Sequence, residues 1–412
     1  MAKVAKLIMV TAENNNKFYN MTENTNGTFD VEYGRVEKTS VKENYDMSRW
    51  DSKLKEKLKK GYKDVTHLYS EIVPTATTKG GVTTFTAITN SQVKQLIDAL
   101  QAYAKKSIQQ NYTVSSDKVT EAQVTEAQAS LTDLAKTLAI GVKAKAINDK
   151  LLHLYHIIPR QMKDVKSHLF DDIKNKSDFE LAKKRLDAEQ DTLDVMAGQV
   201  AMNKAAKKGE DPKAVAKTLT MLEALGLEVE EADAKAIAMI KAMMGPNVKQ
   251  FGKAFKVVNK KTQLAFETNL AKAANKQCTM FWHGSRNENW FNIISTGLLI
   301  RPSGAVYSGS AFGDGIYFAD KFQKSYGYTS GSGSYWARGT SNKAYLAVYN
   351  VNVGKQHIVQ HSDSSLSYKK VQAQGCDSTY AKPGGGSYIQ NAEYIIYQAS
   401  QCTIAYLLEV EG

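Results

Sequence analysis

Three segments near the end of the chain place polar, chemically useful side chains within apolar stretches. FWHGSR at 281–286 runs from an apolar strand into a polar turn, so the imidazole of His283 and the hydroxyl of Ser285 lie at a strand end. NAEYIIY at 391–397 puts the carboxylate of Glu393 at the head of an apolar strand, where burial is costly without a partner. Sites tend to be built at strand ends, and an ionisable carboxylate beside a core needs a reason to be there.

Taken singly, each segment also has a purely structural explanation. A buried, hydrogen-bonded histidine accounts for His283 alone, and FGDGIYFAD at 312–320 alone is a tight turn that leads into a core strand. The combination of the three segments in this order, with KSYGY at 324–328 after the second, is what indicates a site.

The last third of the chain, which must position these groups, reads mainly as sheet. Beyond Lys249 the segments have alternating or continuous apolar residues, and Gly, Ser and Tyr fill the connections. The predicted β-rich segments are FKVVNKKTQLAFE, TMFWHGS, GIYFAD, KAYLAVYNVNVGKQHIV, AEYIIYQASQC and TIAYLLEV. We therefore predict an α+β domain dominated by sheet.

The middle of the chain, from Ser91 to about Gly245, is predicted to be helical because apolar residues recur there at three-and-four spacing. Ser91 and Ser177 are the predicted N-caps. The stretch at 125–159, which ends in LLHLYHIIP, is predicted to be one long helix. His153 and His156 share a face of it, and a core or surface position is a simpler prediction for them than a ligand role.

The N-terminal part alternates short strands with Asn- and Gly-rich turns and is predicted to be a small β-rich module. It closes with an amphipathic helix from Met47 to Gly61, whose outer face is crowded with lysines. That face is either an ordinary solvated surface or a surface for phosphate groups.

Composition sets the broad class of protein. The chain of 412 residues has a net charge of +12 and is 42% hydrophobic, as expected for several folded domains with an anionic partner such as nucleic acid. Cys278, Cys376 and Cys402 show no paired spacing, so we expect neither disulfides nor a zinc site, and a reducing compartment. Without a signal peptide or apolar span in the sequence, we expect a soluble intracellular protein that has no membrane partner.

Together the C-terminal segments resemble the catalytic domain of the poly(ADP-ribose) polymerases over roughly 251–411. HGSR, the GLLI turn, FGDGIYFAD, KSYGY, NAEYIIY and TIAYLLEV carry this resemblance. It implies that the protein consumes NAD⁺ as a substrate, without a metal, through a triad of His283, Tyr317 and Glu393. Nicotinamide leaves such a substrate neutral and the ribose gains oxocarbenium character, which a carboxylate at Glu393 would stabilise while it polarises an acceptor hydroxyl.

The resemblance also implies the binding roles. Tyr328 would stack on the nicotinamide opposite Tyr317, and Lys324 would lie on the acceptor side or at the solvated surface. The residues implied to bind NAD⁺ are His283, Gly284, Ser285, Asn289, Tyr317, Ser325 and Tyr328.

The upstream blocks extend the resemblance to the shorter DNA-dependent members of the family. The helical block is similar to their regulatory helical domain, which covers the NAD⁺ site until DNA binds. The N-terminal module resembles a WGR domain, the DNA-end-sensing module, with Tyr33 in place of the usual tryptophan. The implied DNA contacts are Tyr33, Arg35, Lys57 and Lys60.

We therefore expect a multidomain chain. The expected parts are a small β-rich, WGR-like DNA-binding domain at 1–75, a linker at 76–90, an all-α helical regulatory bundle at 91–225 and an α+β, sheet-dominated ADP-ribosyltransferase catalytic domain at 226–412.

The expected function is transfer of ADP-ribose from NAD⁺ to protein acceptors, itself included, and to a growing ADP-ribose chain, when a DNA strand break binds. We expect a monomer away from DNA, in the nucleus of a eukaryote or in the cytoplasm and nucleoid of a bacterium. A mono-ADP-ribosyltransferase of protein or DNA ends and a catalytically silent DNA-end-binding scaffold remain as alternatives, with simple NAD⁺ hydrolysis as a third.

Overall fold

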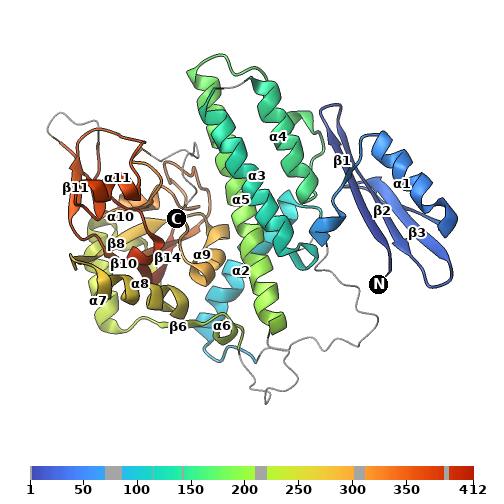
Figure 1. Ribbon diagram of the computed structural model, residues 1–412. Helices are drawn as coiled ribbons and strands as arrows, with labels where there is room; N and C mark the ends of the chain where they lie inside the picture. Colours follow the sequence, from blue (N-terminus) through green and yellow to red (C-terminus); the bar gives the residue numbers. More distant parts are fainter. Residues whose placement is uncertain are drawn as a thin grey trace. The chain divides into compact units, whose positions relative to one another are not determined.

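A computed structural model of the protein describes residues 2–69, 86–114, 116–141, 143–208, 220–300, 311–384 and 389–412 (Figure 1). The chain divides into two compact units. One comprises Met1–Gly80 and Lys106–Asn203, and the other comprises Gly81–Lys105, Lys204–Ala305 and Gly309–Gly412. Most of the predicted linker at 76–90 lies outside the described residues, which resume at Thr86.

The first unit begins with an antiparallel sheet of strand order β4-β3-β2-β1-β5. Its strands are β1 (Val4–Thr11), β2 (Asn15–Glu23), β3 (Thr28–Arg35), β4 (Val41–Asp46) and β5 (Lys63–Asp64). Helix α1 (Trp50–Lys59) packs on one face of the sheet, where the indole of Trp50 meets the ring of Phe29 at 5.0 Å. The predicted β-rich module and its closing helix are therefore both present.

Helices make up the rest of the first unit: α3 (Glu121–Ala139), α4 (Ala144–Ile157), α5 (Lys176–Lys208) and the end of α2 (Ser91–Asn111). The prediction of one helix over 125–159 was wrong. The chain breaks between α3 and α4 at Gly141, whose φ of +71° is a left-handed conformation that glycine adopts without strain.

Both predicted N-caps were also wrong. An asparagine that precedes each predicted serine caps the helix instead. Asn90 Oδ1 accepts from the backbone N–H of Gln92 at 2.9 Å, and Asn175 Oδ1 accepts from that of Asp178 at 3.0 Å. Asparagine is as good an N-cap as serine, so residue type alone did not separate the candidates.

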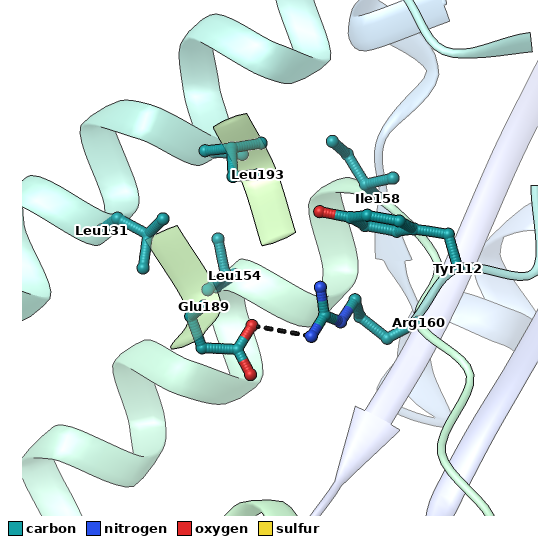
Figure 2. A pocket seen from close by; sticks show the side chains of 8 residues that line it. Tyr112, Leu131, Leu154, Ile158, Arg160, Glu189 and Leu193 are labelled. Carbon is teal, nitrogen blue, oxygen red and sulfur yellow. Dashed lines mark ion pairs between the residues drawn. The ribbon is translucent and has the colours of Figure 1, made fainter. Parts of the chain in front are cut away.

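A buried ion pair joins the segment after α4, at Arg160, to helix α5, at Glu189. Arg160 Nη2 is 3.0 Å from Glu189 Oε2, and the two side chains are 8% and 7% exposed. Tyr112 packs its ring 4.7 Å from the guanidinium, and Tyr155 donates its hydroxyl to Glu189 Oε1 at 3.1 Å. Figure 2 shows the pair at the edge of a small cavity that is otherwise lined mainly by apolar side chains such as those of Leu131, Leu154 and Leu193.

The β module and the helices of the first unit share hydrogen bonds. The Val10 N–H donates to His156 Nε2 at 3.2 Å, and Asn16 Nδ2 donates to the Arg160 carbonyl at 3.2 Å. Arg35 Nη2 donates to the carbonyls of Met162 and Lys163 at 3.3 and 3.1 Å. His156 is thus a buried structural histidine, as the sequence predicted.

Two sheets form the core of the second unit. The first is antiparallel, of order β6-β7-β14-β10-β8, with β6 (Leu227–Glu231), β7 (Phe251–Asn259), β14 (Cys402–Glu411), β10 (Lys343–Asn352) and β8 (Cys278–Gly284). The second has the order β11-β12-β13-β9, with β11 (Gln356–Val359), β12 (Ser378–Ala381), β13 (Glu393–Ile396) and β9 (Ile316–Phe318). Paired backbone hydrogen bonds of 2.8 and 3.0 Å between Trp282 and Ala319 join the two sheets.

Short helices cover the sheets of this unit. They are α6 (Met221–Ala224), α7 (Ala234–Met244), α8 (Lys260–Lys272), α9 (Trp290–Thr296), α10 (Phe322–Tyr326) and α11 (Tyr368–Ala373). The predicted strand FKVVNKKTQLAFE is strand only as far as Asn259, whose Oδ1 accepts from the N–H groups of Lys261 and Thr262 at 3.1 Å and so starts α8. The sequence also predicts a helix over PKAVAKTLTMLEAL at 212–225, of which the structure describes only residues 220–225, where α6 lies.

Candidate active site

His283 lies next to the end of β8, and its ring is tied to the neighbouring sheet. Its Nδ1 is 3.0 Å from the backbone carbonyl oxygen of Tyr317 on β9. A carbonyl oxygen accepts only, so Nδ1 carries the hydrogen and Nε2 keeps its lone pair. Burial lowers the pKa of His283, an effect that outweighs the opposing one of this bond, so the ring is neutral near pH 7.

Tyr317 is fixed by the loop that precedes it. Its hydroxyl donates to the Gly313 carbonyl at 2.8 Å and accepts from the Phe312 N–H at 2.9 Å. Burial is also the main reason that the pKa of Tyr317 is raised, which keeps the phenol neutral. Because its hydroxyl is engaged in this way, the ring is the part of the Tyr317 side chain that is left for further contacts.

Gly284, at the end of β8, lies directly against α10. A Cβ atom at Gly284 would overlap the backbone carbonyl oxygen of Ser325. The missing side chain therefore allows the backbone of the strand to lie directly against the backbone of the helix at Ser325. Close by in the sequence, Asn289 Nδ2 donates to Ser285 Oγ at 3.1 Å, while the buried Asn289 Oδ1 has no hydrogen-bond partner among the described residues.

Glu393 begins β13, and its carboxylate forms an ion pair with Lys324 on α10. Lys324 Nζ lies 2.8 Å from Glu393 Oε1, and the side chains are 14% and 18% exposed. Burial by itself would lower the pKa of Lys324, but the nearby Tyr328 and Glu393 groups outweigh it and raise that pKa. The ammonium is therefore charged, and it holds the carboxylate in one orientation.

Tyr328 follows α10, and its ring has one aromatic contact, with Trp336, and one cationic contact, with Lys324. Its ring stacks near-parallel on the indole of Trp336, with centroids 6.1 Å apart and an interplanar angle of 20°. Lys324 Nζ is 5.7 Å from the centre of each ring. Burial is the main cause of the raised pKa of Tyr328, so this phenol is also neutral near pH 7.

The structure links the residues expected in the transferase site through direct contacts. His283 contacts Tyr317, Gly284 lies against Ser325, and Lys324 binds Glu393. Strand β13, which Glu393 begins, pairs with β9, which carries Tyr317. Lys324 is therefore a part-buried partner of the carboxylate and not a solvated surface lysine.

The four residues implied to contact DNA all have partners within the first unit. Tyr33 donates its hydroxyl to Glu43 at 2.9 Å, and Lys60 pairs with Glu56 at 2.6 Å. Lys57 places its Nζ 4.4 Å from the ring centre of Tyr19 and 5.9 Å from that of Tyr33. Arg35 binds backbone carbonyls, as described above, including that of Asn14 at 2.8 Å.

Two features of the structure were not predicted. Trp336 lies beside Tyr328, and the sequence signal for it was the adjacent Tyr335-Trp336 pair in a Ser- and Gly-rich loop. The Arg160–Glu189 pair had no clear signal, because both residues belong to types that are common on helix surfaces.

Comparisons with known proteins identify a catalytic domain in this part of the chain. The model of the poly(ADP-ribose) polymerase catalytic domain matches residues 235–412. The putative poly [ADP-ribose] polymerase-like 100L of Invertebrate iridescent virus 6 is 33% identical over 164 residues, which cover 38% of this chain and 84% of that protein. The uncharacterized protein 101L of the same virus is 33% identical over 49% of this chain and 80% of its own length.

Cellular enzymes match over a smaller share of their length. Poly [ADP-ribose] polymerase 2 of Homo sapiens is 30% identical over 159 residues, 32% of this chain and 26% of that protein. The human protein mono-ADP-ribosyltransferase PARP3 is 30% identical over 32% of this chain and 28% of its own length.

The chain belongs to the poly(ADP-ribose) polymerase family. It is an NAD⁺ ADP-ribosyltransferase, and NAD⁺ is the substrate of its catalytic domain. Across the described ranges, no cluster of three or more His, Cys, Asp or Glu side chains is arranged to hold a metal ion. No helix within those ranges is long and apolar enough to cross a membrane.

Proposed function

We propose that the protein transfers ADP-ribose from NAD⁺ to protein acceptors, its own chain included, in response to DNA ends. We further propose that Glu393 carries the chemistry. The observation that carries this second proposal is the Lys324–Glu393 pair, in which a 2.8 Å ion pair orients a carboxylate at the head of β13. A carboxylate that is already oriented loses little free energy to reorganisation when positive charge develops on the substrate.

The proposed role of Glu393 follows from the bond that breaks. Cleavage of the bond between nicotinamide and ribose releases neutral nicotinamide and leaves positive charge on the sugar. One oxygen of Glu393 accepts from the nicotinamide-ribose hydroxyl and stabilises this charge, while the same carboxylate polarises the attacking acceptor hydroxyl. Lys324 holds the carboxylate and lies on the acceptor side.

The proposed binding mode divides NAD⁺ between two sets of residues. The nicotinamide stacks on Tyr328 opposite Tyr317, while backbone groups of Gly284 and the Ser325 hydroxyl bind the carboxamide. His283, Ser285 and Asn289 bind the adenosine half. Because His283 is neutral with the hydrogen on Nδ1, its Nε2 accepts a hydrogen bond from a ribose hydroxyl of NAD⁺. The ring does not serve as a cation for the phosphates of NAD⁺.

The role of Glu393 is tested by Glu393→Gln, which keeps the shape of the side chain and removes its charge. We expect NAD⁺ turnover to fall by about 100- to 1,000-fold, while nicotinamide still binds. Glu228→Gln is the matched control because Glu228 is an exposed carboxylate of the same unit, paired with Lys260 at 2.9 Å. A Glu393→Gln enzyme with more than about a tenth of the wild-type turnover would remove Glu393 from the chemistry.

DNA ends are the proposed activator, and the first unit supports this part of the proposal. Its β module carries a lysine-rich helix, and the chain has a net charge of +12. Tyr33, Arg35, Lys57 and Lys60 are the proposed DNA contacts, which would exchange their present partners for the nucleic acid. Arg35 and Asn16 also bind the segment between α4 and α5, so a change in the module would reach that segment.

Product length decides between poly- and mono-ADP-ribosylation. We favour a polymer because a carboxylate at Glu393, held by Lys324, can polarise the hydroxyl of a growing ADP-ribose chain as well as that of a protein. A mono-ADP-ribosyltransferase is among the relatives, so transfer of a single ADP-ribose unit is the alternative. Labelled NAD⁺ products on a denaturing gel should form a ladder, and a single modified band would favour the mono-transferase. We also propose that the protein is a monomer away from DNA, in the nucleus of a eukaryote or in the cytoplasm and nucleoid of a bacterium.

A further inference from the structure

An exposed tryptophan lies beside the proposed nicotinamide site, on a loop that is held firmly. Trp336 and Tyr335 are 58% and 75% exposed, whereas the other three tryptophans of the chain are buried. The loop is anchored by the backbone N–H groups of Trp336 and Ala337, which donate to the Gly327 carbonyl at 2.8 and 2.9 Å. An exposed indole on an anchored loop needs an explanation, since this side chain is usually well buried.

The contacts of Trp336 point toward Tyr328. The two rings are near-parallel at 6.1 Å, within the range of offset aromatic stacking. A Cβ atom on Gly327 would lie 3.1 Å from Trp336 Cδ1, so the indole packs closely over this glycine, next to Tyr328 in the chain. Tyr328 is 37% exposed and its hydroxyl contacts Lys324, so the indole supplies its aromatic support.

We propose that Trp336 is a positioning residue. It holds the Tyr328 ring at the angle at which that ring stacks on nicotinamide, and so it sets the affinity of the enzyme for the nicotinamide half of NAD⁺. A ring that is held before binding loses less side-chain entropy when the substrate arrives. This inference rests on the proposed stacking role of Tyr328.

The test compares Trp336→Ala, Trp336→Phe and a control, Leu264→Ala, which shortens another exposed apolar side chain of the same unit. Trp336→Ala should raise the KM for NAD⁺ by about 3- to 10-fold and change kcat by less than about twofold. Trp336→Phe should restore the KM to within about twofold because it keeps an aromatic face. A KM that is unchanged in Trp336→Ala would overturn the inference, and a lower KM would show that the indole obstructs the site.

A second readout separates positioning from general damage to the fold. Nicotinamide and ADP-ribose are the two halves of NAD⁺, so each can be tested as a competitive inhibitor. Trp336→Ala should weaken inhibition by nicotinamide by the same factor as the KM and leave inhibition by ADP-ribose unchanged. Equal weakening of both inhibitors would overturn the inference, because a distorted site affects both halves.

Tyr328→Ala distinguishes this inference from the proposed function beneath it. If Tyr328→Ala leaves nicotinamide inhibition unchanged, the stacking role of Tyr328 fails and the inference fails with it. If Tyr328→Ala weakens nicotinamide inhibition while Trp336→Ala does not, the stacking role stands and the role of Trp336 alone is overturned.

Discussion

At the scale of single residues, His283, Tyr317 and Glu393 are each fixed by a partner, which for His283 and Glu393 comes from a distant part of the chain. Lys324 orients Glu393, the Tyr317 backbone orients His283, and the Gly313 carbonyl and Phe312 N–H fix Tyr317. The imidazole of His283 and the phenols of Tyr317 and Tyr328 are neutral, whereas Lys324 and Glu393 form an oriented ion pair. Such a site suits a reaction in which the leaving group departs neutral and positive charge develops on the sugar.

The identities of these residues could be predicted from the sequence, but their partners could not. His283, Tyr317 and Glu393 lie in short segments whose order and residue types are distinctive. The contact between Lys324 and Glu393 joins residues 69 positions apart, and it depends on how α10 packs near β13. Local periodicity carries no information about such a contact.

Gly284 offers a test at this scale. Gly284→Ala should weaken nicotinamide inhibition and lower kcat/KM by at least about tenfold, since the added carbon overlaps the Ser325 carbonyl and separates β8 from α10. Steady-state kinetics would measure this loss. Thermal unfolding of the same variant would show whether the unit remains folded. Wild-type kinetics in a folded Gly284→Ala enzyme would contradict the close packing proposed for the carboxamide site.

At the scale of helices and strands, most elements follow from hydrophobic patterning. The alternation that predicted strands around His283 and Glu393 matches β8 and β13. The predictions of secondary structure were wrong where a single polar residue or glycine starts or ends a helix against the hydrophobic pattern. Asn259 starts α8 in a segment that was predicted to be strand, and Gly141 divides the helix predicted over 125–159. End signals of this kind are single residues, whereas periodicity is an average over many.

The buried Arg160–Glu189 pair leads us to predict how a substitution changes the stability of the first unit. Glu189→Gln should lower the free energy of unfolding by about 3–5 kcal/mol, because it leaves the Arg160 guanidinium buried without its countercharge. Urea denaturation would measure the change. Asp149→Asn, which breaks the exposed pair with Lys145, is the control and should cost less than about 0.5 kcal/mol. A Glu189→Gln protein as stable as wild type would show that the pair is not the buried contact described.

His156 makes the contact between the β module and α4 dependent on pH. Burial is the main reason that its pKa is lowered to about 4 from the usual 6.5. Between these two pH values the unfolded chain binds more protons at His156 than the folded chain does. The contribution of His156 to the free energy of unfolding is therefore complete above pH 6.5 and is lost as the pH falls toward 4. Lowering the pH from 7.5 to about 5 should cost about 2 kcal/mol through this group.

His156→Gln provides the matched variant for that measurement. Its side-chain oxygen can still accept from the Val10 N–H, but it does not titrate. The free energy of unfolding of the variant should therefore fall less steeply between pH 7.5 and 5 than that of the wild type. Parallel slopes would show that His156 does not carry this pH dependence.

At the scale of the whole molecule, two compact units carry different kinds of surface. One contains the lysine-rich β module and the helices α3, α4 and most of α5, and the other contains the catalytic domain that uses NAD⁺. The sequence predicts a β-rich part, a helical part and a second β-rich part, because the hydrophobic pattern and the composition change along the chain. Their division into two units could not be predicted, because α2 contributes residues to both.

NAD⁺ turnover by the full chain, measured with and without DNA ends, tests the proposed activation most directly. Blunt-ended or nicked duplex should raise turnover by about 5- to 150-fold, the range of a coupling free energy of 1–3 kcal/mol. Covalently closed circular duplex should not. The stimulation should weaken as salt rises, since the proposed contacts involve phosphates. Equal turnover with blunt-ended, nicked, closed circular and no DNA would contradict activation by DNA ends.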